Sequence, residues 1–419
     1  MQVLKIKKLI TTHPLMSLFL FALVVRLCLV FVVALRFNGT LFGDDKYYFY
    51  LIRTHLSQQT SDWGDYGHRL WSLSLSFLMP ASYAYKISGS SASAVLAVSA
   101  FIGSLVPALT ARILLHYVTR GTAIAVGLVL AALPSQVLWS ALLLKDSYIA
   151  LGFILISFVL RWWSKQTKPS GILVGAVTLM VLTLYVQRIR LHSLIVLCIA
   201  IFLSVLLKGG GSRLVKSGVA ISLLLVMPWA IGGGLAGSNF AKTLSTGLGV
   251  QRQAGANGAA TAIVSPPVSL STSSSSNTAI GDPSQKNDAS EIAPNKQADT
   301  YIDDLLYLPS GWKVMLIDPT PSQLSRSKNL YFPFLEHLIW YPVLILAVYG
   351  AVTLRKWTID LTFSGLLFVG LTTMWGLAEG NFGTAFRHRT EFVWIVFLFA
   401  GIGFQTFSSR NRKQNHSHL

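Results

Sequence analysis

Long apolar segments restrict this chain to few folds. Residues 15–35 (LMSLFLFALVVRLCLVFVVAL) hold a single charged residue, and roughly 20 apolar residues in a helix cross the ~30 Å of a bilayer core. Lipid offers no partner for free backbone groups, so spans must be helices or closed barrels, and no apolar run here alternates like a barrel strand. With 53% hydrophobic and 12% charged residues, the sequence predicts an all-α, polytopic integral membrane protein whose first segment is a retained anchor.

Hydropathy predicts about ten spanning helices. They fall at residues 15–35, 92–117, 121–140, 147–163, 171–187, 191–207, 214–235, 335–354, 359–378 and 391–407. Residues 69–88 (RLWSLSLSFLMPASYAYKIS) are ambiguous, because they are apolar but contain Pro80 and carry charges at both ends. They fit either a further span or an amphipathic helix that lies along the membrane interface.

The distribution of Lys and Arg favours the interfacial interpretation of residues 69–88, because short cytoplasmic loops collect basic residues. If 69–88 does not cross, six basic groups fall on one side, around Lys5, Arg112, Arg161, Lys208, Arg355 and Arg410. Asp360 is then the only side-chain carboxylate on that side. We therefore expect both termini in the cytoplasm and residues 36–91 outside. The net charge of +18 follows from this topology and requires no nucleic-acid partner.

Composition divides the chain into three parts. Residues 1–235 form an N-terminal membrane module, and residues 335–419 form C-terminal membrane helices with a basic cytoplasmic tail. Between them, residues 236–334 form an external loop. Its central part, residues 254–300, is rich in Ser, Thr, Pro and Asn and nearly lacks large apolar residues, so we expect it to be disordered. Residues 301–334 mix aromatics, Pro and charges, which is typical of a segment on a membrane surface.

Two adjacent carboxylates, Asp44 and Asp45, follow the first span on the predicted outer side. Neighbouring carboxylates repel each other unless they are solvated, metal-bound or matched by cations, and the proton affinity of at least one is shifted. Such a pair suits a general base or a metal ligand. Asp is also favoured at helix starts, so the same pair fits a simple cap of a surface helix over residues 46–57.

Other charged residues are expected on the same face, although outer loops normally carry few cations. They are Lys145, Asp146, Arg188, Arg190, Arg387, His388 and Arg389. Arginine offers bidentate donors to phosphate oxygens, so carboxylates with converging arginines at a membrane surface suit a phosphate-bearing lipid. The alternative for each cation is snorkelling to lipid headgroups, and for Lys145 the two interpretations weigh equally.

These features together resemble the GT-C superfamily of membrane glycosyltransferases. Within it, the chain is most similar to bacterial protein mannosyltransferase-like and aminoarabinose transferases, which use polyprenyl-phosphate sugars. The resemblance rests on Asp44 and Asp45, on Tyr48 three residues after the second acid, and on Asp146 in LPSQVLWSALLLKDSYIA. It covers about the first 190 residues. The C-terminal half, with its Ser-rich insertion, matches no feature of the family.

The resemblance implies sugar transfer on the outer face of a bacterial plasma membrane, in the synthesis of a cell-surface glycan. The donor would be a polyprenyl-phosphate sugar, and the acceptor a lipid-linked or cell-surface glycan. Asp44 would act as general base, with Asp45 and Asp146 beside it, and the arginines would stabilise the departing phosphate. The donor bond is already activated, so no cofactor is required. Carboxylates also suit Mg²⁺ or Mn²⁺, which could bridge Asp44 and Asp146.

Arg26 lies at the centre of the first span, where a charge is costly and usually faces a partner. We expect a structural ion pair with an acid from the outer side, the candidates being Glu336, Glu379 and Glu391.

Two other functions compete with glycosyl transfer from a lipid phosphate. An O-antigen-type polysaccharide polymerase or ligase would place its chemistry on residues 301–334 and Arg387–Arg389 and leave Asp44 dispensable. A lipid-linked sugar flippase would need polar residues along its spans, whereas the spans here are apolar through their centres apart from Arg26.

Overall fold

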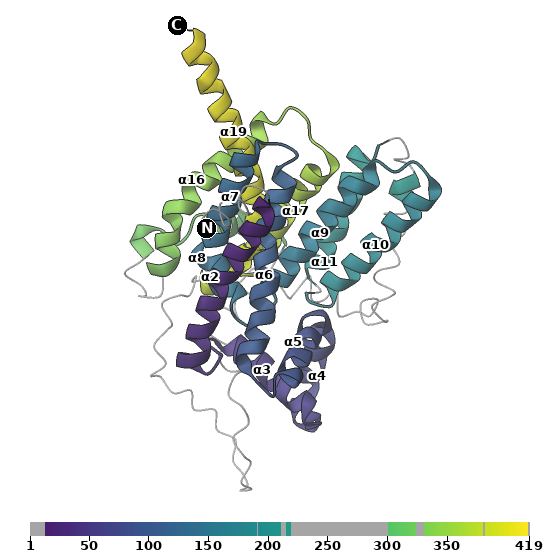
Figure 1. Ribbon diagram of the computed structural model, residues 1–419. Helices are drawn as coiled ribbons and strands as arrows, with labels where there is room; N and C mark the ends of the chain where they lie inside the picture. Colours follow the sequence, from purple (N-terminus) through teal and green to yellow (C-terminus); the bar gives the residue numbers. More distant parts are fainter. Residues whose placement is uncertain are drawn as a thin grey trace, which may run out of the picture.

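The computed structural model describes residues 13–190, 192–210, 215–218, 301–323, 331–379 and 382–417. In this part of the chain every regular element is a helix (Figure 1). The elements are α2 Pro14–Phe37, α3 Gly43–Leu56, η1 Thr60–Trp63, α4 Gly64–Leu73, α5 Leu75–Ile87, α6 Ala92–Leu114, α7 Arg120–Ala132, α8 Pro134–Ser140, α9 Asp146–Ser164, α10 Pro169–Gln187, α11 Ser193–Lys208, α15 Tyr301–Leu316, η2 Pro321–Gln323, α16 Tyr331–Thr353, α17 Ile359–Ala378, α18 Phe382–His388, η4 Arg389–Glu391 and α19 Val393–Ser417.

Seven of the described helices are long and apolar enough to cross a membrane, which confirms an all-α membrane protein. They are α2, α6, α9, α10, α16, α17 and α19. The predicted span at 121–140 is the pair α7 and α8, bent by 59°, and the one at 191–207 is the shorter helix α11. The predicted span at 214–235 lies almost entirely outside the described residues, as do the predicted disordered residues 254–300. A count of ten spans is therefore not confirmed.

Residues 69–88 do not form one continuous helix. They are divided between α4 and α5 at Ser74, and neither helix is long enough to count as a span. Helices α3, α4 and α5 lie together at one end of the molecule, beside the end of α6 (Figure 1). This arrangement agrees with the interpretation of 69–88 as a stretch at the membrane interface.

The bend between α7 and α8 interrupts the backbone hydrogen bonds of the helix in the middle of the bundle. In a continuous helix the amide of Ser135 would donate to the carbonyl of Ala131. Here the helix restarts at Pro134, and the Ser135 amide donates instead to Glu336 Oε2 of α16 at 2.6 Å. The freed Ala131 carbonyl accepts from Arg26 Nη1 of α2 at 3.2 Å. Two charged side chains of opposite sign thus satisfy the two halves of the missing bond.

The predicted ion pair of Arg26 is therefore wrong. Besides the Ala131 carbonyl, the guanidinium donates to the hydroxyl of Ser140 at 2.7 Å and to the carbonyl of Ala22 at 3.0 Å. Its partners are oxygens of the interrupted helix and of its own helix, a role that the hydropathy pattern cannot reveal. Among the contacts of the described residues, Arg26 pairs with none of the three proposed acids, Glu336, Glu379 and Glu391.

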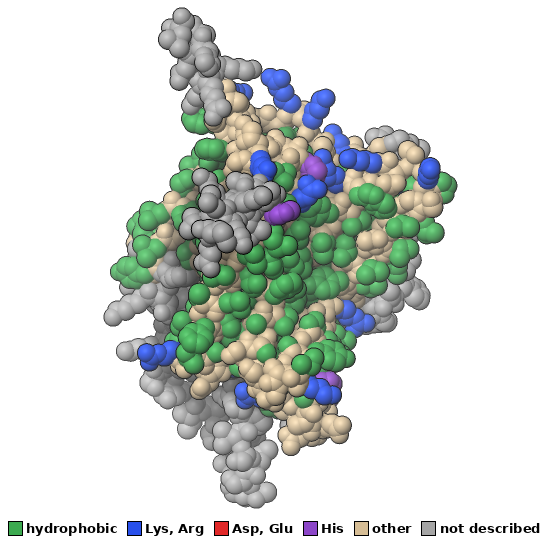
Figure 2. All heavy atoms as spheres, viewed as in Figure 1, with side chains coloured by type: hydrophobic (Ala, Val, Ile, Leu, Met, Phe, Trp, Pro, Cys, Tyr) green, Lys and Arg blue, Asp and Glu red, His purple; other side chains and the backbone are tan. Residues whose placement is uncertain are grey.

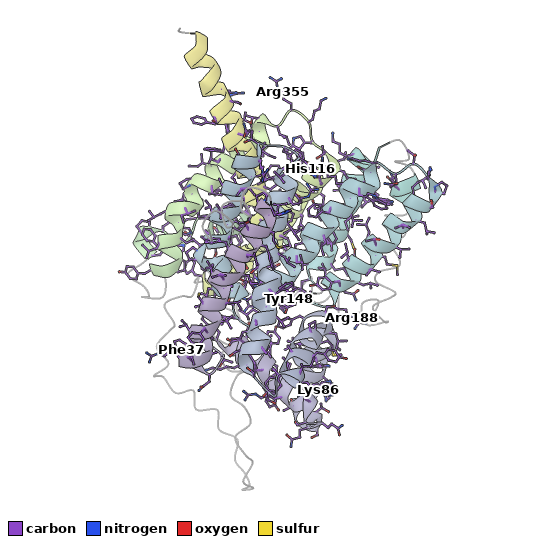
Figure 3. All side chains as sticks on the ribbon, viewed as in Figure 1. Phe37, Lys86, His116, Tyr148, Arg188 and Arg355 are labelled. Atoms are coloured by element: carbon purple, nitrogen blue, oxygen red, sulfur yellow. The ribbon has the colours of Figure 1, made fainter. Side chains whose placement is uncertain are left out.

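The basic loops gather at the end of the bundle opposite α3. In Figure 2 most visible Lys and Arg side chains lie beyond a broad apolar band, at the end where α19 leaves the bundle. His116 and Arg355 mark this end in Figure 3, whereas Phe37 and Arg188 lie toward the other. Asp360, the one acid expected on the basic side, forms an ion pair with Arg161 at 3.2 Å.

The segment predicted to lie on the membrane surface contains helix α15, which packs against α17. A side-chain carbon at Gly311 would lie 2.2 Å from the carbonyl oxygen of Gly376, so the two backbones touch. The C-terminal helices also pack against the N-terminal module, because Gly401 of α19 contacts Leu114 of α6. The helices on the two sides of residue 335 therefore pack against one another.

We predict that a cysteine at position 57 reacts with an impermeant thiol reagent added from outside, whereas a cysteine at position 121 does not. Ser57 is exposed at the end of α3, and a side-chain carbon at Gly121 meets no atom within 4 Å, so both substitutions fit the fold. The measurement is labelling of intact cells in a background that lacks Cys28 and Cys198. Labelling at both positions from outside would contradict the topology.

Candidate functional site

Asp44, Asp146 and Arg387 converge from three distant parts of the chain. Arg387 of α18 pairs through Nη1 with Asp44 Oδ2 and through Nε with Asp146 Oδ2 at 3.1 Å. The Asp44 side chain is 53% exposed, that of Arg387 is 12% exposed and that of Asp146 is fully buried. The guanidinium therefore joins an accessible carboxylate to a buried one.

Local structure explains why both carboxylates are held in this position. Asp44 lies in the first turn of α3 and Asp146 is the first residue of α9, and a helix N-terminus stabilises negative charge through its macrodipole and free amides. Residues 141–144, which connect α8 to α9, are buried and apolar, so they fix the start of α9. The site lies at the end of the bundle that carries α3, opposite the basic loops.

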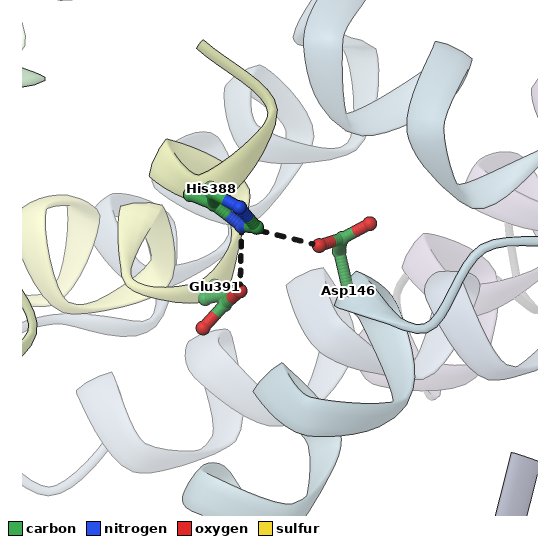
Figure 4. Close-up of side chains that lie close together, drawn as sticks. All are labelled: Asp146, His388 and Glu391. Carbon is green, nitrogen blue, oxygen red and sulfur yellow. Dashed lines mark hydrogen bonds and ion pairs between the residues drawn. The ribbon is translucent and has the colours of Figure 1, made fainter. Parts of the chain in front are cut away.

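A second group of charges lies behind Asp146 and centres on Arg190. This arginine donates to Asp146 Oδ1 at 3.3 Å, pairs with Glu391, and lies 2.6 Å from Nδ1 of His388. Its guanidinium also stands 4.8 Å from the ring centre of Trp375. Figure 4 shows Asp146, His388 and Glu391 facing one another, with His388 close to both acids.

Three members of this group were not predicted as site residues. Glu379 lies 3.0 Å from Nε2 of His388, and Trp375 stacks on the same imidazole with the ring centres 3.9 Å apart. Glu391 accepts from the indole N–H of Trp375 at 3.3 Å as well as from Arg190. The only sequence signal for the two acids was their position at the outer ends of spans, which made them candidate partners of Arg26.

The proton affinities of the site groups reflect burial and their charged neighbours. Burial opposes ionisation of Asp44, but Arg387 outweighs it and holds the pKa of that carboxyl below its usual value. Burial, followed by Arg190 and Arg387, lowers the pKa of the Lys145 ammonium to about 7. Burial raises the pKa of Glu379 to about 8. Of these two carboxyls, Asp44 thus stays ionised more readily than Glu379.

Asp45 is bound to the backbone and not to Arg387. Its Oδ2 accepts from the amide of Leu41 at 2.7 Å, and its Oδ1 accepts from the amides of Phe42 and Lys46, each at 2.8 Å. The side chain is fully buried. Of the two adjacent acids, Asp45 therefore closes the turn before α3, as the capping interpretation proposes, while Asp44 faces Arg387.

Of two residues predicted to bind substrate, Arg188 lies apart from the charged groups, whereas the buried Tyr48 lies within electrostatic reach of Asp44 and Arg387. Tyr48 is 4% exposed and packs edge-to-face on Phe77, with ring centres 5.1 Å apart. Arg188 is exposed at the end of α10 and donates to the carbonyl of Ser72 at 3.4 Å. It points away from Arg190, although only Ile189 separates them.

Arg389 does not belong to the charged groups that Arg387 and His388 join. It donates to the carbonyls of Asp318 at 2.7 Å and Val314 at 3.3 Å, and Nη1 lies 2.9 Å from Nε2 of His337. Trp340 covers the guanidinium, with the ring centre 5.4 Å away. Arg389 is buried and holds the end of α15 against α16, so its geometry is that of a structural residue.

Neither candidate metal position fits a cation. Single ligand atoms of Asp146, His388 and Glu391 lie within 4.8 Å of one another, but Arg190 contacts all three residues and already supplies the positive charge. The proposed bridge between Asp44 and Asp146 is likewise made by Arg387. A divalent ion at either place would be within a few ångströms of a guanidinium, which repels it.

No known family model, curated protein or solved structure matches this chain. Functional inference therefore depends on the residues themselves and on the geometry just described.

We predict that Arg389→Ala lowers the melting temperature of the solubilised protein. The change leaves the carbonyls of Val314 and Asp318 without a donor, at about 1–3 kcal/mol for each buried group. The matched control is Arg188→Ala, which removes an exposed cation and should leave the melting temperature unchanged. An unchanged melting temperature in Arg389→Ala would show that the arginine is not structural.

Proposed function

We propose that this chain is a membrane glycosyltransferase that moves a sugar from a polyprenyl phosphate to an acceptor on the outer face of the membrane. The observation that carries the proposal is the pairing of Asp44 with Arg387, backed by buried Asp146. Sugar transfer from a lipid phosphate needs a base for the acceptor and a cation for the leaving phosphate. This pair provides both at the end of the bundle that carries the interfacial helices.

The proposed reaction follows from these two groups. The Asp44 carboxylate takes the proton of the acceptor hydroxyl, whose oxygen forms a bond to the anomeric carbon of the donor. The bond from that carbon to the phosphate oxygen breaks, and its electron pair leaves with the phosphate. Arg387 stabilises the growing negative charge, and Lys145, whose pKa is about 7, adds a positive charge in its protonated form. The buried Asp146 holds Arg387 in place through its contact with Nε.

The orientation of Arg389 argues against the polymerase or ligase alternative. That function would use Arg387, Arg389 and residues 301–334 together, but Arg389 is enclosed by Trp340 and the backbone of residues 314–318. We further propose that the end with α3 faces outward and that both termini are cytoplasmic, in a bacterial plasma membrane, because the basic loops gather at the opposite end.

We predict that Asp44→Asn lowers the rate of sugar transfer by about 10²–10⁴-fold, the usual contribution of a general base. Asparagine keeps the size of the side chain, Asp44 is 53% exposed, and Arg387 keeps its partner Asp146, so the melting temperature should change little. The measurement is transfer of radiolabelled sugar from a panel of polyprenyl-phosphate hexoses in membranes that contain the protein.

Asp360→Asn is the matched control for this experiment, because it also removes an acid from an ion pair with an arginine, at the opposite end of the bundle. Its transfer rate should stay near that of the wild type. Normal transfer by Asp44→Asn would overturn its assignment as general base and favour the polymerase or ligase.

We also predict that transfer continues after EDTA treatment of the purified protein, because Arg387 and Arg190 occupy the positions between the carboxylates. The measurement compares the rate before treatment, after treatment and after Mg²⁺ or Mn²⁺ is added back. A rate that falls with EDTA and returns with either ion would contradict the assignment.

A further inference from the structure

His388 lies between two groups that otherwise do not touch. On one side its Nε2 is 3.0 Å from Glu379 Oε1, just beyond the end of α17. On the other side its Nδ1 is 2.6 Å from Arg190 Nη1. Trp375 lies parallel to the ring, at an interplanar angle of 7°, and prevents it from tilting. The imidazole is therefore fixed in position and in plane.

The shortest contact of the ring favours one position for its proton. Nδ1 lies 2.6 Å from Arg190 Nη1 and 3.1 Å from Glu391 Oε1. A guanidinium only donates, so we assign Nδ1 as the acceptor of the shorter contact, which puts the proton of a neutral ring on Nε2, facing Glu379. Arg190 Nη1 has two hydrogens, one for His388 and one for Glu391. A second proton on the ring would turn the Arg190 contact into a repulsion. Burial, followed by Arg190 and Arg387, lowers the pKa of His388 well below its usual value and keeps the ring neutral.

From His388 the contacts run without interruption to the proposed base. Arg190 binds Asp146 Oδ1, Arg387 binds Asp146 Oδ2, and Arg387 pairs with Asp44. We propose that Glu379 and His388 are positioning residues for sugar transfer, which fix the direction of Arg190 and, through Asp146, that of the catalytic pair Arg387 and Asp44. This inference rests on the proposed function for its kinetic consequence, but the chain of contacts is testable without it.

Substitutions at position 388 distinguish the roles of the two ring nitrogens. His388→Asn places an amide oxygen near the position of Nδ1 and can still accept from Arg190. His388→Gln places its amide near Nε2, toward Glu379, and His388→Leu offers neither contact. We expect Leu and Gln to lower kcat by about 10–100-fold, as loss of an orienting partner does, with little change in the KM of the donor. Asn should restore kcat to within a few-fold of the wild type. Equal rates in the Asn and Leu variants would overturn the proposal.

His337 provides a matched control elsewhere in the protein. It is also buried, lies 2.9 Å from an arginine, Arg389, and stacks on an aromatic ring, Tyr341, with centres 4.7 Å apart. It has no contact with the chain that leads to Asp44. His337→Leu should lower the melting temperature but leave kcat unchanged. A comparable loss of kcat in His337→Leu would mean that His388 acts only through general stability.

A double-mutant cycle tests the contacts without any sugar transfer. The melting temperatures of His388→Leu, Asp146→Asn and the double variant are compared with that of the wild type. Because both residues bind Arg190, the double variant should lose less than the sum of the single losses. Additive losses would overturn the positioning chain even if the protein transfers sugar. Coupled losses in a protein that transfers no sugar would retain the chain of contacts and reject only the proposed function.

Discussion

The fold depends on how one broken backbone hydrogen bond is satisfied inside the membrane. An unpaired amide or carbonyl in hydrocarbon costs several kcal/mol, so a helix can be interrupted there only where protein groups replace the lost partners. Arg26 and Glu336 do so for the Ala131 carbonyl and the Ser135 amide. They come from the first span and from α16, so the interruption ties the two ends of the chain together. The chain then continues through α8 to Lys145 and Asp146, so the position of the bend determines where these two site residues lie.

The charged side chains of the site alternate in sign from one contact to the next. Asp44, Arg387, Asp146, Arg190 and Glu391 follow one another with opposite signs at each contact. Removing one partner of a buried pair typically costs roughly 3–5 kcal/mol, because the other charge is left unpaired. The five groups come from four helices, α3, α9, α18 and η4, and from the turn that follows α10. Each charge is therefore held by neighbours that are distant in sequence, and the site is a product of the whole bundle.

The sequence predicts the apolar helices and the face on which the charged residues gather, because hydropathy and loop charge act over long windows. It correctly brings Asp44, Asp146 and Arg387 to one end. It cannot separate Arg387 from Arg389, or Arg188 from Arg190. Arg188 and Arg190 lie in the turn after α10, and Arg387 and Arg389 lie on either side of the change from α18 to η4. The local path of the backbone there decides which way each side chain faces, and it cannot be read from residue types.

The partners of Arg26 were also beyond the reach of the sequence. A carbonyl freed by a bend cannot be recognised from residue types. A search for a partner of Arg26 among acidic residues could therefore give only Glu336, Glu379 or Glu391. Glu336 does serve the same bend, through the amide on the other side of the missing bond. Glu379 and Glu391 face His388 instead. Which acid serves which cation depends on packing between helices far apart in the chain.

The ion pair of Asp44 with Arg387 has a consequence for the protein without substrate. Arg387 lowers the pKa of Asp44, which makes the carboxylate a weaker base toward water than a free aspartate. Under the proposed function, an arriving lipid phosphate would compete for the same guanidinium, and drawing Arg387 toward it would release Asp44 and strengthen it as a base. Water is the most abundant hydroxyl at the membrane surface. A base that becomes strong only beside a bound donor would protect a scarce lipid-linked sugar from hydrolysis.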